Sequence, residues 1–417
     1  MNPKLPPPVW ALIRALWLPS PAAESCRLLS ALDQEAWKQA LDFADRTQLT
    51  LVVWQRLLEG LAWENVPPET CRRLKQNLTD NTDRVRRIEA ASAEIADRFI
   101  AAGVDFLVLK GLSHSPSFGV DARLRVQYDI DYYCPPKEIH RARNILLDLD
   151  YEPLAEHDEV PRDHLAPMAR KTGWQWRGNY FDPEIPLSID LHFRFWDPET
   201  ERLPATGVGE FWERRVERAI DGRRVFELEP ADRLAYAALH SLKHLLRGSL
   251  RLYHIYEVAC FLHNRKEDAE FWARRNFLHS TELRRLESVV FLLAEKYFGA
   301  RTPGESLPQD VMDWFDRYGW SPVEALVQPN KHELFLHLSM LHGWQDNWKV
   351  LRRRLLPARL PGHVEAVMVP KQEMTIRLWF RKWVRYFAWL ASRFYFHARL
   401  LLPTLWALAR WQFGRRR

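Results

Sequence analysis

The hydrophobic period of the chain changes twice along its length, and this change restricts the fold more than any other feature. Residues 1–98 carry apolar side chains three and four positions apart, as in Leu41–Leu58, which is the spacing of helices. Short runs with the length and alternation of strands follow at Val104–Leu109, Val126–Cys134 and Pro186–Phe195. Helical spacing returns after Pro230. The pattern predicts an α+β fold in which a small mixed-sheet core lies between N- and C-terminal helical regions.

Four regions are expected within the 417 residues, a length that suits two or three domains. They are an N-terminal helical region (1–98), an α/β core (99–226), a C-terminal helical domain (227–346) and a basic, aromatic tail (347–417). In the core, two prolines precede a helix predicted across Lys137–Asp148, and weaker strands are predicted at Tyr151–Leu154 and His164–Met168. Catalytic residues are expected in the α/β core, because the flanking helical regions lack residues at the spacing of a catalytic motif.

Charge is divided unevenly along the chain. The tail over 347–417 holds 16 Lys and Arg but only two Glu, a balance of +14, so the preceding 346 residues sum to −8. A protein that coats nucleic acid would spread positive charge over its folded body, so that class is excluded and no specific nucleic acid is expected as a partner.

The spacing of the cysteines and the length of the apolar runs indicate the cellular compartment of the protein. The four cysteines lie far apart in sequence, without the spacing of a disulfide scaffold or a zinc site, which favours a reducing compartment. The first residues lack the pattern of a secretory signal, and no uncharged apolar run is long enough to span a membrane. A cytoplasmic protein is expected.

Two carboxylates lie in the second predicted strand. The strand period of two turns Asp129 and Asp131 to one face, while Ile130 points to the other. Two acids on one face repel each other unless a cation lies between them, and Mg²⁺ prefers such oxygen ligands together with substrate phosphates. Asp190 lies in the third strand and adds a third acid if the two strands are neighbours. The alternative is that these acids are exposed residues of a half-buried edge strand.

Three short motifs together carry a resemblance to a known family. They are Phe106–Gly111 (FLVLKG), Arg125–Asp131 (RVQYDID) and Ile189–His192 (IDLH). In this order they resemble the uncharacterised nucleotidyltransferase family of the polymerase-beta-like superfamily, whose members show a strand ending in Lys-Gly, an Arg four residues before D-I-D, and a later D-L-H. The likeness extends over most of residues 40–345. It implies a nucleotidyltransferase core and Mg²⁺ or Mn²⁺ as the cofactor.

The resemblance also implies roles for individual residues. Asp129 and Asp131 would bind the metal ion that holds a nucleoside triphosphate, and Asp190 would complete a second metal site and help to deprotonate the acceptor hydroxyl. The implied nucleotide contacts are Lys110, Gly111, Ser113 and Arg125. The sequence departs from the superfamily at the glycine turn, where Leu112 follows Gly111 in place of Ser or Gly. It departs again at Glu257, a supporting position where similar proteins often have Asp.

Several histidines are weighed as further site residues. His240 and His244 are four apart on a predicted helix and can ligate one metal ion, but no third ligand is evident in the sequence, so we interpret them as part of a polar helix face. His192 shares the strand face of Asp190 and either supports the site or is a packed polar residue. His114 and Ser115 follow the glycine turn and are candidates to line the site.

The tail contains a basic helix rich in aromatic residues. Between residues 376 and 413, large apolar side chains recur at three- and four-residue spacing, and Arg377, Arg381 and Arg385 form a basic stripe. Such a helix is typical of an anionic membrane surface. Two alternatives stay open: docking to a protein partner, and packing back on the acidic body.

Taken together, the sequence predicts a Mg²⁺-dependent nucleotidyltransferase that moves a nucleoside monophosphate from an NTP to a hydroxyl group. The acceptor is a protein, a metabolite or a glycan intermediate. The alternative is a catalytically weak or inactive binding protein with the same fold, acting in a membrane-associated biosynthetic system. In both cases a cytoplasmic protein is expected, and it is held peripherally on the inner face of the membrane if the basic tail binds the membrane rather than a protein partner or the acidic body.

Overall fold

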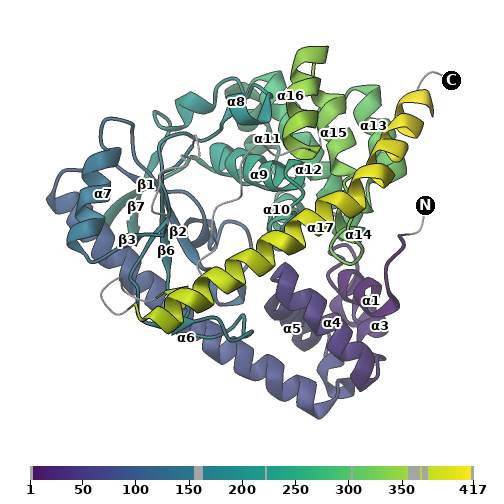
Figure 1. Ribbon diagram of the computed structural model, residues 1–417, viewed down its shortest axis with the longest axis horizontal. Coiled ribbons are helices and arrows are strands. Elements are labelled where there is room, and N and C mark those ends of the chain that lie inside the picture. The colour runs from purple at the N-terminus through teal and green to yellow at the C-terminus, as the bar shows by residue number, and fades with distance from the viewer. Residues whose placement is uncertain are drawn as a thin grey trace.

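The computed structural model describes residues 3–154, 163–220, 223–301, 304–355, 367–368 and 374–414. A mixed sheet lies on one side of the molecule, helices from both ends of the chain gather on the other side, and one long C-terminal helix crosses the molecule (Figure 1). The predicted α+β class, a small sheet core flanked by helical regions, is confirmed.

The N-terminal region is helical, as predicted. It contains α1 (Pro7–Ala15), α2 (Ala22–Ser25), α3 (Arg27–Ser30), α4 (Gln34–Thr47), α5 (Thr50–Glu59), a short 3₁₀ turn (Ala62–Asn65) and α6 (Pro68–Ala101). The Asp33 side chain accepts a hydrogen bond from the Ala36 N–H and caps α4. The helical spacing over Leu41–Leu58 covers two helices rather than one, because Gln48 adopts φ 63° and ends α4.

The long helix α6 joins the N-terminal helices to the sheet. Its C-terminal half packs Ile95 and Phe99 into a core formed with the sheet. Buried polar side chains of α6 hold the segment that enters the central strand: Asn81 donates to the Arg125 carbonyl at 3.0 Å, and Arg84 donates to the Gln127 carbonyl at 2.7 Å. This helix therefore positions the strand that carries the first two predicted site carboxylates.

Among the described residues, seven strands form one mixed sheet in the order β3-β4-β6-β2-β1-β8-β7. The strands are β1 (Leu107–Val108), β2 (Asp129–Tyr133), β3 (Glu152–Pro153), β4 (Met168–Ala169), β6 (Ser188–His192), β7 (Val216–Ile220) and β8 (Arg223–Glu227). All three principal strand predictions are confirmed, with β1 shorter than its apolar run. The hairpin of β7 and β8 was not predicted, because its charged residues hide the alternation expected of a strand. The helix predicted across 137–148 is α7 (Ile139–Asp148).

Helices return after Pro230, as predicted. They are α9 (Pro230–Leu246), α10 (Leu252–Asn264), α11 (Ala269–Leu278), α12 (Thr281–Phe298), α13 (Gln309–Tyr318), α14 (Ser321–Glu324), α15 (Glu333–Met340) and α16 (Trp344–Leu355), with the short α8 (Pro198–Glu201) before them. Apolar side chains of α1, α4 and α5 share one continuous core with those of α9, α10 and α12. The two helical regions that flank the sheet core in the sequence thus pack on each other, while the predicted domain boundaries stay predictions.

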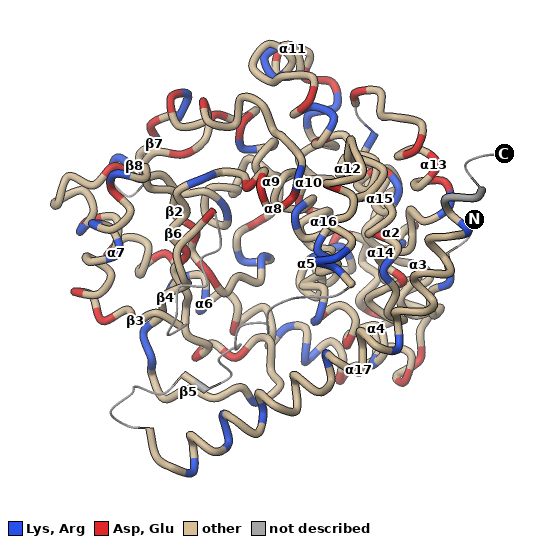
Figure 2. The backbone as a smooth tube through the Cα atoms, turned by 45° about the horizontal axis from the view of Figure 1, so that its top comes forward, with Lys and Arg blue, Asp and Glu red and all other residues tan. Residues whose placement is uncertain are grey.

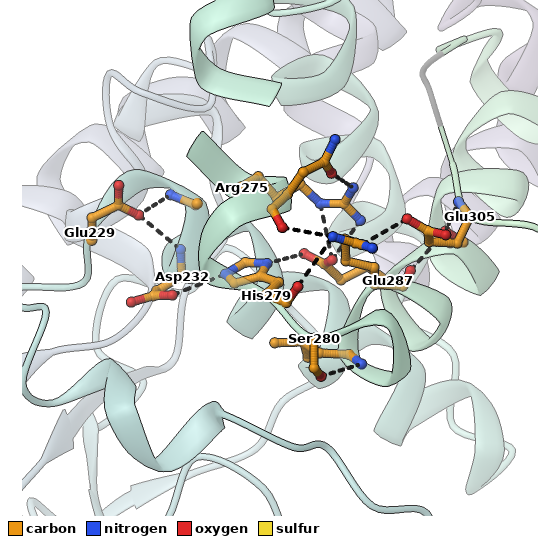
Figure 3. A network of polar contacts seen from close by, with 12 residues as sticks. Glu229, Asp232, Arg275, His279, Ser280, Glu287 and Glu305 are labelled. Carbon is orange, nitrogen blue, oxygen red and sulfur yellow. Dashed lines mark hydrogen bonds and ion pairs between the residues drawn. The ribbon is translucent and has the colours of Figure 1, made fainter. Parts of the chain in front are cut away.

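A buried ionic network ties three of these helices together (Figure 3). His279, just after α11, lies between Asp232 of α9 and Glu287 of α12, with its Nε2 atom 3.0 Å from Asp232 Oδ1. Arg275 of α11 contacts Glu287 at 2.6 Å, and Arg214 contacts Asp232 at 2.9 Å. The network fixes α9, one wall of the site described below, against α11 and α12.

The last helix, α17 (Ile376–Gly414), follows a two-stranded pairing of β5 (Trp174–Gln175) with β9 (Val367–Met368). Part of the predicted tail, including 356–366 and 415–417, lies outside the described residues. None of the described helices combines the length and the apolar character that a membrane crossing requires.

Candidate active site

The carboxylates predicted from the sequence meet on one face of the sheet. Strands β2 and β6 run parallel as neighbours, and their register places Asp131 directly beside Asp190. Strand alternation puts Asp129 on the same face, while Ile130 and Ile189 are buried on the opposite face. Asp131 is buried, and the other two carboxylates are half-buried. The condition set by the sequence, that the two strands be neighbours, is met.

Asp131 is held in its charged form by two neighbours. Lys110 Nζ and His192 Nε2 each lie 2.9 Å from Asp131 Oδ1. Although burial opposes ionisation, these two contacts bring the pKa of Asp131 below its usual range. His192 is supported in turn by His164, whose ring lies 5.0 Å away. His192, left open by the sequence, therefore supports the carboxylate face directly.

Burial and repulsion between the carboxylates disfavour the charged forms of Asp129 and Asp190. Burial raises the pKa of Asp129, and the charge of Asp131 raises it further. Burial likewise raises the pKa of Asp190 well above its usual range, with added repulsion from Asp131 and Asp129. Among the described residues, Lys110 is the one lysine or arginine that forms an ion pair with any of these carboxylates, and His192 is the other basic side chain in contact with Asp131. The face thus carries an excess of negative charge.

This excess and the donor set fit a divalent cation. Ligand atoms of Asp131, Asp190 and His192 all lie within 4.8 Å of one another. Carboxylate oxygens are the ligands preferred by Mg²⁺, and a cation placed among them removes the repulsion that raises the pKa of Asp129 and Asp190. The residues present are therefore suited to Mg²⁺ or Mn²⁺.

The glycine turn after β1 approaches the same face. Gly111 has φ 66°, and a Cβ atom there would lie 2.3 Å from the Gln127 side chain, so both conformation and space require glycine. The residues that follow, Gly111–His114, form a single 3₁₀ turn rather than the start of an α-helix. The buried Ser113 Oγ atom has no hydrogen-bond partner among the described residues. The turn can therefore offer a hydroxyl group but little helix dipole.

Arg125 does not face the carboxylates as a free cation. Its guanidinium group contacts Glu257 of α10, and His114 Nδ1 lies 3.1 Å from the other Glu257 oxygen. Although burial opposes it, Arg125 and His114 lower the pKa of Glu257. His114 also stacks on Phe118, with ring centroids 4.0 Å apart, and is buried rather than lining an open site. Arg125, Glu257 and His114 thus join the glycine turn to α10.

Helices α9 and α10 add a wall of basic and imidazole groups beside Lys110. The rings of His240 and His244 from α9 and of His254 from α10 lie close together, with ligand atoms within 4.8 Å of one another. His240 Nδ1 is 3.3 Å from Lys110 Nζ, so this wall continues directly from the carboxylate face. Arg251, at the start of α10, is exposed and forms no ion pair among the described residues.

The charges around this wall favour an anion over a second metal ion. Burial, together with the charges of Arg251 and Lys110, lowers the pKa of His244 to about 3. Burial and Lys110 also lower the pKa of His240, so both imidazoles are neutral near pH 7. Neutral imidazoles can ligate a metal, but two adjacent cations repel one. A phosphate group gains from the same cations and accepts hydrogen bonds from imidazole N–H groups.

Comparison with known proteins gives the family. The family model described as uncharacterised nucleotidyltransferase matches residues 33–299. The chain belongs to this family. Searches of curated proteins and of solved structures returned no match. The resemblance expected from the sequence is confirmed, and family membership supports nucleotidyl transfer as the general activity.

The matched part of this nucleotidyltransferase contains every predicted site residue but not α17. The structure brings together Lys110, the glycine turn and the three carboxylates, and it places Arg125 behind them against Glu257. Sequence reasoning missed His254 as the third imidazole, because it comes from another helix. It also gave Arg251 no role, although the sequence places this residue at the start of a predicted helix.

Proposed function

We propose that this nucleotidyltransferase transfers a nucleoside monophosphate from an NTP to a hydroxyl group in a Mg²⁺- or Mn²⁺-dependent reaction. One observation carries the proposal: Asp131 and Asp190 lie side by side on parallel strands, with Asp129 on the same face and too little positive charge to balance them. The hydroxyl oxygen would attack the α-phosphorus as its proton passes to Asp190, the bond from the α-phosphorus to the oxygen that bridges to the β-phosphorus would break, and pyrophosphate would leave.

Each group has a role that follows from its position. Asp129 and Asp131 would hold the ion that carries the triphosphate, and Asp190 would hold the second ion near the acceptor hydroxyl. Bound divalent ions supply charge neutralisation at the phosphoryl oxygens. Lys110 and His192 orient Asp131 through their contacts with one of its oxygens.

The triphosphate would lie against the glycine turn and the imidazole wall. Gly111 lets the backbone come close, and Ser113 offers its unpartnered hydroxyl group. Lys110 and Arg251 supply positive charge. Arg125, an implied phosphate contact, would act by positioning the turn, since its guanidinium group is committed to Glu257.

The acceptor is proposed only as a hydroxyl compound: a protein side chain, a metabolite or a glycan intermediate. The protein would act in the cytoplasm, where its four cysteines, all free and buried, stay reduced. A weak or inactive binding protein with this fold is the second candidate. It is favoured by Leu112 in place of the Ser or Gly of the superfamily turn and by the commitment of Arg125 to Glu257.

Labelled nucleotides test the proposal. Purified protein is incubated with NTPs labelled at the α-phosphate, with Mg²⁺ and with a cell lysate that supplies acceptors. We expect label transfer by the natural chain and by the control Asp148→Asn, an exposed acid on α7. We expect none from the Asp129→Asn/Asp131→Asn variant. Equal transfer by all three proteins would contradict the assignment, and metal-dependent binding without transfer would favour the second candidate.

A further inference from the structure

The long helix α17 is fixed to the body along its inner face. Near its C-terminal end, the Trp411 side chain is 1% exposed and its ring lies 5.7 Å from that of Tyr318 on α13. Farther along, Lys331 Nζ lies 2.9 Å from His397 Nδ1. At the other end, Arg381 donates to Gln175 of β5 at 3.0 Å. The helix therefore joins the helical side of the molecule to the β5 segment. Figure 1 shows its course across the molecule.

The outer face of α17 exposes a continuous apolar stripe. Its members recur at helical spacing and range from 39% to 88% exposed: Ile376, Trp379, Phe380, Trp383, Val384, Phe387, Phe394, Tyr395, Leu402, Leu405 and Trp406. The stripe extends for about 45 Å at the rise of an α-helix. Soluble proteins rarely leave an apolar surface of this extent without a partner. Trp344 and Trp348 of α16 are also exposed, at 75% and 57%.

The charges on the same helix are all of one sign. Residues 376–414 contain seven Lys and Arg and neither Asp nor Glu. Figure 2 shows the basic positions spaced along α17 without an acidic one between them. Arg377 and Arg399 are exposed and form no ion pair among the described residues. Exposed aromatic groups together with uncompensated basic groups match the interfacial region of a membrane with anionic lipids.

We propose that the outer face of α17 docks the protein flat on a membrane surface that contains anionic lipids. The helix would lie on the surface with its stripe among the acyl chains and its arginines at the phosphate groups. A second copy of the chain fits less well, because a two-fold contact would place one all-basic helix against another. This inference does not depend on catalysis. It gives a role to the apolar stripe, which has none in the nucleotidyl-transfer proposal.

Of the three roles that the sequence left open for this helix, the structure shows packing on the body, and only for one face. Packing on the body accounts for the inner face, where Thr404, Leu408 and Trp411 are buried. It does not account for the outer face. Because the contacts of the inner face hold the helix in place, docking requires no unfolding or release of the tail. The conformational entropy lost in ordering the helix is already lost on folding, so it does not oppose docking.

Vesicle co-sedimentation of the full chain, without nucleotide, tests the docking. We expect binding to vesicles of phosphatidylcholine mixed with phosphatidylglycerol, much weaker binding to phosphatidylcholine alone, and loss of binding as salt is raised. The variant Phe380→Ser/Phe387→Ser should bind at least about tenfold more weakly. Its control, Phe277→Ser/Leu28→Ser, removes apolar groups that are 82% and 54% exposed on other helices and should bind like the natural chain.

A pair of charge-reversing substitutions on α17 tests the electrostatic contribution to vesicle binding. Arg377→Glu/Arg399→Glu should weaken binding by about fivefold or more per site. The control Arg98→Glu/Arg285→Glu reverses two exposed arginines elsewhere and should have little effect. Unchanged thermal unfolding of all four variants shows that they fold. Equal vesicle binding by stripe and control variants would overturn the proposal. So would binding to neither kind of vesicle, or a dimer of the natural chain that the stripe variants abolish.

Discussion

Two clusters of acids and bases lie beside α9, one around Asp232 and one around Lys110 and His240, and they differ in their balance of charge. In the network around His279, each carboxylate has its own cation: Arg214 contacts Asp232 at 2.9 Å, and Arg275 contacts Glu287 at 2.6 Å. Figure 3 shows the His279 imidazole between the two acids. In the candidate active site, three carboxylates share Lys110. The network around His279 pairs each of its acids with a cation, whereas the candidate active site has fewer positive than negative groups.

The pKa directions report the same difference. Although burial opposes it, Asp232 and Glu287 raise the pKa of His279, and Arg275 and His279 lower that of Glu287. In the site, burial and mutual repulsion raise the pKa of Asp129 and of Asp190. A buried cluster that already pairs its charges stabilises packing, whereas one that leaves them unbalanced is arranged for a ligand. Four predictions test this contrast.

The largest expected effect is the loss of transfer activity in Asp190→Asn, by about three orders of magnitude, because one site for a divalent ion is lost. Without divalent ions, the same variant should have a higher Tm than the natural chain, since it removes a repelling charge. Mg²⁺ should raise the Tm of the natural chain more than that of the variant. Thermal unfolding with and without Mg²⁺ measures this, and a lower Tm in the variant without Mg²⁺ would contradict the proposed imbalance.

The matching change in the balanced network should act in the opposite direction. Asp232→Asn removes one of the two acids that contact Arg214 and one of the two that contact His279, and should lower the free energy of unfolding by about 3 kcal/mol. Urea unfolding measures it. Asp148→Asn, on the surface, serves as the control. A change as small as that of the control would show that the network contributes little to stability.

The pH dependence of stability should follow His279. Its pKa is raised in the folded protein, so its stabilising contribution is fully present below the unfolded pKa of about 6.5 and is lost as pH rises through the folded pKa. The free-energy difference between the natural chain and His279→Gln should therefore be larger at about pH 6 than at about pH 9. A difference that is constant with pH would contradict a charged His279.

The smallest expected effect concerns the imidazole wall. Arg251→Gln should weaken NTP binding by about tenfold, because it removes an exposed cation that no described acid pairs. Arg98→Gln, an exposed arginine on α6, should leave binding unchanged. Equilibrium binding of a fluorescent NTP analogue with Mg²⁺ distinguishes the two. Stronger binding of Zn²⁺ than of NTP at this wall would instead support a metal site at the three imidazoles.

Local periodicity was enough to predict much of the site. The alternation around Ile130 placed Asp129 and Asp131 on one face, and the apolar runs predicted the strand that ends just before Lys110 and the strand that carries Asp190. Failures came where partners are distant in sequence. Arg125 was assigned to phosphate, but its partner Glu257 lies on α10, and His240 and His244 were left without the third imidazole of His254.

The sequence by itself determined the order of helical, mixed and helical regions, the common face of two acids, and the basic, aromatic character of the last helix, because each is a local pattern of side chains three, four or two residues apart. Tertiary structure alone decided that β6 lies parallel beside β2, so that Asp190 joins the other acids. It also decided which face of α17 is buried. Both depend on contacts between residues far apart in the chain, which no local period encodes.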